Sequence, residues 1–140
     1  MPNPLVPIAA SRHPLGKRGQ LALSDLAGER FILRERGSGT RMAIDAHFKR
    51  MKFKPDLRLE LGSNEAIRAA VAGNLGIAVV STHALQGAGR QGVKVLDVRD
   101  FPIESRWHVV WQRGKRLSPI ARVFREHLIA ESAAWVRRVA

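Results

Sequence analysis

The chain has 140 residues, no cysteine, and 24 Lys plus Arg against 12 Asp plus Glu, which gives a formal charge of +12. This length allows one domain of ordinary size, and the lack of cysteine excludes a disulfide scaffold, an iron–sulfur cluster and a thiolate zinc site. No apolar run approaches the ~18 residues that a membrane span needs, and the first residues lack a secretory signal, so we expect a cytoplasmic protein that contacts no membrane.

The first part of the chain alternates apolar runs with turn residues. Leu5–Ala10 and Phe31–Leu33 are short apolar runs that predict buried strands. A glycine-rich loop follows the second run. After that loop, Ile44, Phe48 and Met51 recur at i, i+4 and i+7, which predicts a helix with one apolar face.

The middle of the chain continues the same alternation. Leucines alternate with charged residues over 57–61, which predicts a strand with one polar face. A helix then begins after Ser63 and turns Ile67 and Val71 inward. Apolar runs at 77–80 and 93–98 predict two further strands, the first of the continuous kind found in parallel sheets.

The last part of the chain predicts one strand and one long helix. Residues 106–112 alternate, with Trp107 and Trp111 on one face, and we interpret them as a strand. Ser118 and Pro119 are typical of a helix start, and the helix should run to about residue 138. Its apolar stripe comprises Ile120, Phe124, Leu128 and Trp135. Strands that alternate with helices indicate an α/β fold with a mostly parallel sheet flanked by helices.

The charge is concentrated at the two ends of the chain. Residues 1–54 carry a net +7, residues 55–105 a net −1, and residues 106–140 a net +6. A basic protein that binds nucleic acid directly is therefore one hypothesis. The basic runs at 49–54 and 113–116 match no helix-turn-helix, RNA-recognition or KH signature, and each also fits a solvated surface.

The segment Arg34–Arg41 (RERGSGTR) lies between a predicted strand and a predicted helix. Its glycines let backbone amides turn toward a ligand, and the helix start adds a partial positive charge. Hydroxyl and guanidinium groups supply further donors, so the segment suits a carboxylate, phosphate or sulfate. The candidate binding residues are Arg36, Ser38, Gly39, Thr40 and Arg41. The alternative is a glycine turn with an ordinary N-cap.

A second helix start, at Ser63 and Asn64, follows the next strand. Successive ends of parallel strands meet at one sheet edge, so we expect these two residues near the first loop, although an N-cap serine is commonly structural. No histidine pair, Gly-x-Ser-x-Gly elbow or carboxylate pair is present, so we predict no metal site, no catalytic residue and no cofactor. The chain should not be an enzyme.

Four segments together resemble one family. They are 3–15 (NPLVPIAASRHPL), 34–41 (RERGSGTR), 63–81 (SNEAIRAAVAGNLGIAVVS) and 95–124 (VLDVRDFPIESRWHVVWQRGKRLSPIARVF). The chain resembles the effector-binding (substrate-binding) region of LysR-type transcriptional regulators, and is most similar to regulators of carbon-fixation (RuBisCO) operons. The resemblance covers nearly the whole chain.

The resemblance implies two periplasmic-binding-protein-like (type 2) lobes joined by two crossover strands. Residues 1–14 would form one crossover strand, and residues 15–103 the effector-binding second lobe. Residues 104–140 would form the return crossover strand and the C-terminal helix of an incomplete first lobe. DNA would be bound only through an N-terminal helix-turn-helix domain that this chain does not contain.

The resemblance also implies a sensing function. Residues 38–41 match the loop that meets the effector, which would be a small anionic metabolite: a phosphorylated sugar, an organic acid or a nucleotide. Without the first lobe, the C-terminal helix and the strand with the two tryptophans would expose an apolar face, so we expect self-association through the C-terminal helix or the crossover strands. A free anion- or solute-binding protein of the same fold, and a basic nucleic-acid-binding protein, remain alternatives.

Overall fold

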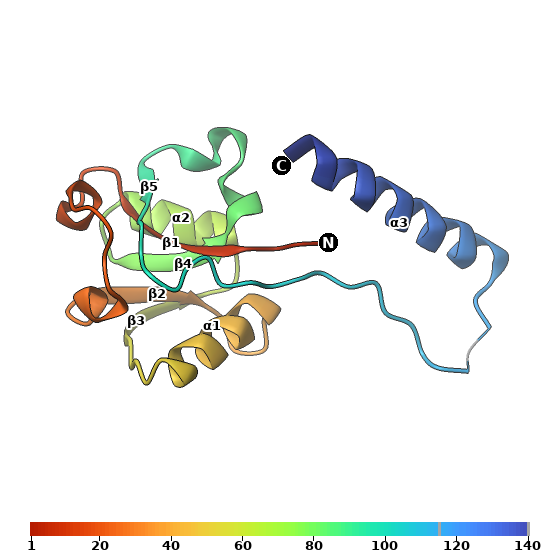
Figure 1. Ribbon diagram of the computed structural model, residues 1–140, viewed down its shortest axis with the longest axis horizontal. Coiled ribbons are helices and arrows are strands. Elements are labelled where there is room, and N and C mark those ends of the chain that lie inside the picture. Colours follow the sequence, from red (N-terminus) through yellow and green to blue (C-terminus); the bar gives the residue numbers. More distant parts are fainter. Residues whose placement is uncertain (115, 140) are drawn as a thin grey trace. The chain divides into compact units, whose positions relative to one another are not determined.

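The computed structural model describes residues 1–114 and 116–139. Figure 1 shows the helices and strands, which in chain order are β1 (Leu5–Ala10), β2 (Arg30–Arg34), α1 (Gly39–Arg50), β3 (Asp56–Leu61), α2 (Asn64–Ala72), β4 (Ile77–Ser81), β5 (Val93–Val95) and α3 (Pro119–Val139). Short 3₁₀ turns lie at Pro14–Lys17, Leu23–Leu26, Thr82–Leu85 and Gly87–Arg90. The chain divides into two compact units, one formed by Asn3–Ser105 and the other by Met1–Pro2 with Arg106–Ala140.

The first unit is built on one five-stranded sheet with the order β3-β2-β4-β1-β5 (Figure 1). Strand β2 is parallel to both β3 and β4, whereas β1 is antiparallel to its two neighbours, β4 and β5. Four strands therefore run in one direction and β1 alone runs the other way. The predicted mostly parallel α/β sheet is confirmed.

The two helices of this unit cover opposite faces of the sheet (Figure 1). Successive residues of a strand point to opposite faces, so Phe31 of β2 packs toward α1 while Ile32 packs toward α2. On the α1 side, Phe48 meets Phe31 edge to face at 5.6 Å between ring centroids. On the α2 side, Ile67 is fully buried, as its spacing predicts. Both helices thus have a buried face that fixes where their N-termini lie.

The prediction that Met51 belongs to the buried apolar face of α1 is wrong, because Met51 is 37% exposed. The helix ends at Arg50, and Lys52 adopts a left-handed backbone with φ +52°. This turn brings Phe53 back to the core, where its ring lies 5.0 Å from that of Phe48. Phe53 therefore takes the place in the core that the helical spacing assigned to Met51.

Strand β3 forms as predicted, but its leucines are not buried. Leu57 and Leu59 are 41% and 36% exposed, because β3 is an edge strand and pairs only with β2. The end of α2 behaves as its sequence suggests: Gly73 is the C-cap and Asn74 adopts φ +59°, a conformation that asparagine tolerates.

The second unit contains α3, and the predicted strand at 106–112 is wrong. Within the described residues this segment forms only one isolated bridge, between Pro2 and Arg106, since no strand lies beside the rest of it. Helix α3 starts where predicted, with the Ser118 hydroxyl accepting a hydrogen bond from the Ala121 amide at 3.3 Å. The side chain of Trp135, assigned to the apolar stripe, lies outside the described residues.

Candidate functional site

The candidate site lies at the sheet edge where the parallel strands β2, β3 and β4 end (Figure 1). The Glu35 amide donates to the Leu61 carbonyl at 3.2 Å, so β2 and β3 stay paired to their last residues. Ser38 then opens α1 and Ser63 opens α2. The two helix starts identified in the sequence therefore follow neighbouring parallel strands and lie at the same end of the sheet.

The loop before α1 presents the first turn of that helix. Gly37 has φ +95°, a backbone conformation that favours glycine, and the Ser38 hydroxyl accepts a hydrogen bond from the Arg41 amide at 3.0 Å. Ser38 is thus an N-cap, which was the structural alternative for this residue. The amides of Gly39 and Thr40 belong to the first turn, where no helical carbonyl is available to them. Such amides are the donors that bind anions at helix N-termini.

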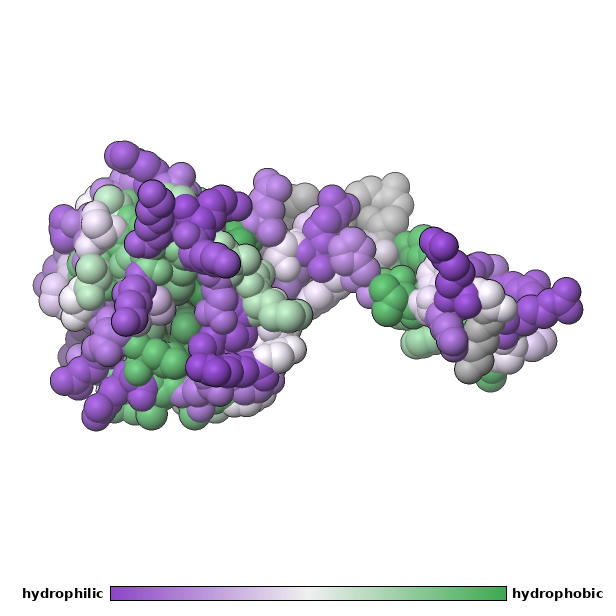
Figure 2. All heavy atoms as spheres, turned by 90° about the horizontal axis from the view of Figure 1, so that it is seen from below, coloured by the Kyte–Doolittle hydropathy of each residue, from purple (hydrophilic) through white to green (hydrophobic). Residues whose placement is uncertain are grey.

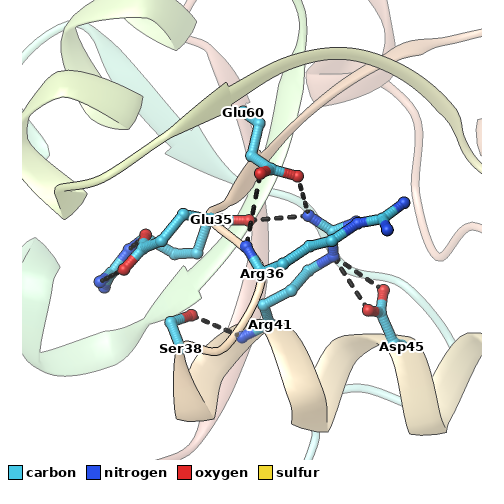
Figure 3. Close-up of polar contacts among 7 residues, drawn as sticks. Glu35, Arg36, Ser38, Arg41, Asp45 and Glu60 are labelled. Carbon is cyan, nitrogen blue, oxygen red and sulfur yellow. Dashed lines mark hydrogen bonds and ion pairs between the residues drawn. The ribbon is translucent and has the colours of Figure 1, made fainter.

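Arg41 is a buried scaffold residue in this structure, with 6% of its surface exposed. Its Nε donates to both carboxylate oxygens of Asp45 at 3.0 Å (Figure 3). One terminal nitrogen donates to the Arg34 carbonyl and to Oε2 of Glu60, both at 2.8 Å. The sequence placed this guanidinium on an anionic ligand; the structure gives it protein acceptors, because a buried charge needs partners close by.

The other two arginines of the loop differ in charge pairing. Arg34 and Glu35 form a two-bond ion pair at 2.7 and 2.9 Å, and the hydrogen bond from Arg34 lowers the pKa of Glu35. Arg36 is exposed, and its side chain points away from Ser38 in Figure 3. Within the described part of the chain, no ion pair involves the Arg36 guanidinium. Arg36 is therefore the loop arginine whose charge is not already neutralised.

The second helix start, at Ser63 and Asn64, has an N-cap residue followed by a residue with an unpaired buried oxygen. The Ser63 hydroxyl accepts from the Ala66 amide at 3.1 Å, so Ser63 is also an N-cap. Asn64, the first residue of α2, has a side-chain oxygen that is buried and accepts no hydrogen bond from the described residues. A buried acceptor that receives no hydrogen bond is costly.

Sequence reasoning missed two groups at this edge. Glu60 of β3 bonds the Arg41 guanidinium, and that hydrogen bond lowers the pKa of Glu60. The buried side-chain oxygen of Asn3 accepts a hydrogen bond from the Ser81 hydroxyl at 2.5 Å. The backbone amide of Asn3 donates to the Ser105 carbonyl at 2.8 Å. Both contacts join residues far apart in the sequence. For Glu60 the only local signal was its opposite charge to the arginines of the loop.

No group of three or more His, Asp or Glu side chains within the described residues is placed to hold a metal ion. Among the described helices, none combines the length and apolar character that crossing a membrane requires. His83, which the sequence places just past a strand end, lies in the turn after β4, and its amide donates to Ser81 Oγ at 3.1 Å.

An α/β lobe with two helix N-termini at one sheet edge is a ligand-binding arrangement. The chain matches the LysR substrate binding domain family over residues 1–133, and it belongs to that family. The resemblance seen in the sequence is thereby confirmed.

Two transcriptional regulators of known sequence are similar to this chain. The chain is 43% identical over 133 residues to the HTH-type transcriptional activator CmpR of Synechocystis, covering 94% of this chain and 44% of CmpR. It is 44% identical to the RuBisCO operon transcriptional regulator of Acidithiobacillus ferrooxidans, covering 94% of this chain and 43% of that regulator. The chain thus spans less than half the length of these relatives.

One solved structure is similar in both fold and sequence. It is the CcmR regulatory domain of Synechocystis PCC6803 in complex with 2-PG, which is 45% identical to this chain with a TM-score of 0.85. The match covers 93% of this chain and 63% of the CcmR chain. The similarity to regulators of carbon-fixation operons that the sequence suggested is confirmed.

Proposed function

We propose that this chain is the effector-sensing region of a LysR-type transcriptional regulator of carbon-fixation genes, and that it binds a small anionic metabolite. The observation that carries the proposal is that two helix N-termini, at Ser38 and Ser63, follow the ends of two neighbouring parallel strands. Helix N-termini bind anions, and the similar CcmR domain carries 2-PG.

The residues at this edge of the sheet would have two kinds of role, binding the ligand and holding the loops. The amides of Gly39 and Thr40, with the Thr40 hydroxyl, would bind the anionic group, and Arg36 would turn toward it from solvent. The Asn64 side chain would turn outward, because its oxygen is buried in this structure, and would then accept from a ligand hydroxyl. Ser38, Ser63 and Arg41 would act indirectly, by holding the loops. A phosphorylated sugar, an organic acid or a nucleotide fits this set.

The mechanism would be a population shift. Effector bound at this edge would favour one arrangement of the regulator over another and so change how the dimer sits on DNA. DNA itself would be bound by a helix-turn-helix domain beyond this chain, in the cytoplasm. The chain would perform no catalysis.

Calorimetric titration with 2-PG, against NaCl of matched ionic strength, tests the proposal. We expect saturable binding at one site, and weaker binding by the variant Thr40→Val. Heat that is indistinguishable from the salt control, or an unchanged affinity in Thr40→Val, would contradict the assignment of this edge.

A direct nucleic-acid binder is the second candidate, and one observation favours it. Lys49, Lys52 and Lys54 are all exposed, and none of them is in an ion pair within the described residues. Binding of random-sequence DNA that weakens steeply between 50 and 200 mM salt, on the order of a thousandfold, would support this candidate. A free solute-binding protein of the same fold would bind 2-PG without any effect on a promoter.

We also propose self-association through the apolar side chains of the second unit. On α3, Ile120 and Phe124 are 80% and 61% exposed, and in the segment before it Val110 is 83% exposed. Figure 2 shows apolar surface on this part of the chain. Apolar surface of this kind is typical of a protein–protein contact.

A further inference from the structure

We infer that Glu60 is a positioning residue of the anion site, an inference that rests on the function proposed above. Glu60 lies on β3, where it pairs in register with Leu33 of β2. One of its carboxylate oxygens accepts from the Arg41 guanidinium at 2.8 Å, and the other lies 3.4 Å from the backbone amide of Arg36 (Figure 3). A single side chain from the neighbouring strand thus contacts the loop and the helix that follows it.

The loop is held at three points through this carboxylate and its partner. Arg41 also donates to the Arg34 carbonyl at 2.8 Å, so the chain is bonded where the loop leaves β2, at Arg36, and in the first turn of α1. Between these points lie Gly37 and Gly39. Glycine gives the backbone the most freedom of any residue, so this stretch needs outside contacts to hold one geometry.

Glu60 is not suited to touch the anion itself. Both of its oxygens face protein donors, and its hydrogen bond with Arg41 lowers its pKa, so it stays ionised near neutral pH. A carboxylate near an anion site repels the ligand. If charge were its only effect, removing Glu60 would tighten anion binding. A positioning role predicts the opposite sign, because a mobile loop must be ordered when the ligand binds.

Three variants separate these possibilities. Glu60→Ala removes both contacts. Glu60→Gln keeps one acceptor oxygen, which can serve Arg41 but not the Arg36 amide as well. Asp45→Asn is the matched control, because Asp45 is the other carboxylate on Arg41 and has no hydrogen bond to the loop backbone among the described residues. Circular dichroism checks that each variant is folded; the 38% exposure of the Glu60 side chain favours that outcome, and Glu60→Gln carries the test if Glu60→Ala unfolds.

The experiment records amide NMR spectra of the 140-residue chain without ligand and during titration with 2-PG. In Glu60→Ala, we expect the amides of residues 36–40 to shift in the free chain and the affinity for 2-PG to fall about five- to tenfold. Glu60→Gln should lie between Glu60→Ala and the wild type, and Asp45→Asn should stay within about twofold of the wild type.

Unchanged or tighter 2-PG binding in Glu60→Ala would overturn the inference while leaving the proposed function standing. An equal loss in Asp45→Asn would also overturn it, because the effect would then come from Arg41 in general. If the wild type itself gives no shift at Gly39 or Thr40 with 2-PG, the proposed function fails and the role of Glu60 in it fails too.

Discussion

Replacing Arg41 with alanine should strongly destabilise the chain. Arg41 lies in the first turn of α1, and the sequence had suggested that it binds the ligand. The substitution removes a side chain that is 6% exposed, together with its bonds to Asp45, Glu60 and the Arg34 carbonyl. The two carboxylates are 54% and 38% exposed, so water can solvate them once their partner is gone.

The magnitude follows from these contacts. Each half-exposed ion pair contributes about 0.5–1 kcal/mol, and the bond to the carbonyl contributes about 1 kcal/mol. Loss of the two further buried methylenes adds about 1.5 kcal/mol. We therefore expect the free energy of unfolding to fall by about 4 kcal/mol.

Urea unfolding measures this change. With a slope near 1.5 kcal/mol/M, the midpoint should fall by about 2.7 M without a change in the slope. Met42→Ala is the control. Met42 is the next residue and is 61% exposed, so this substitution should lower the free energy of unfolding by less than about 0.5 kcal/mol. A loss below about 1 kcal/mol in Arg41→Ala would refute the scaffold role of this arginine.

Three further predictions concern binding, pH and assembly. Thr40→Val should weaken 2-PG binding about tenfold by removing one hydroxyl donor, and in the full-length regulator it should reduce the promoter response to effector while DNA affinity stays the same; an unchanged response would remove Thr40 from the site. Burial, and then the charge of Arg50, lower the pKa of His47, so as pH falls below about 6.5 the unfolded chain gains this proton before the folded chain does. Stability should therefore decrease from pH 7.5 to 5.5, and His47→Gln should flatten that dependence; an equally steep dependence in the variant would contradict the account. Light scattering should show concentration-dependent oligomers that Phe124→Lys weakens, whereas a strict monomer at high concentration would contradict the proposed self-association.

Most of the sheet and both of its helices could be predicted, because their signals are local. The apolar run of β1 and the alternation of β3 depend on nearest neighbours in the sequence. The segment 106–112 also alternates, yet it forms no ladder in the described residues, since a strand needs a partner that a pattern cannot supply. The exposure of Leu57 likewise follows from the place of β3 at the sheet edge, which its own residues do not encode.

The site was predictable only in part, for the same reason. Ser38 and Ser63 could be recognised as helix starts because a cap acts within its own turn. Glu60 could not be recognised as a partner of Arg41, since that bond depends on the register between β2 and β3. The arginine-rich loop therefore suggested Arg36 and Arg41 as ligand cations, and of these two the structure leaves Arg36 without a carboxylate partner among the described residues.

The central claim is that an anion binds at the first turn of α1, beside the start of α2. Amide NMR of the wild-type chain during titration with 2-PG, at constant ionic strength, tests it most directly. The account predicts saturable downfield shifts largest at the amides of Gly39 and Thr40. Shifts spread over the basic residues 49–54, with none at Gly39 or Thr40, would contradict it.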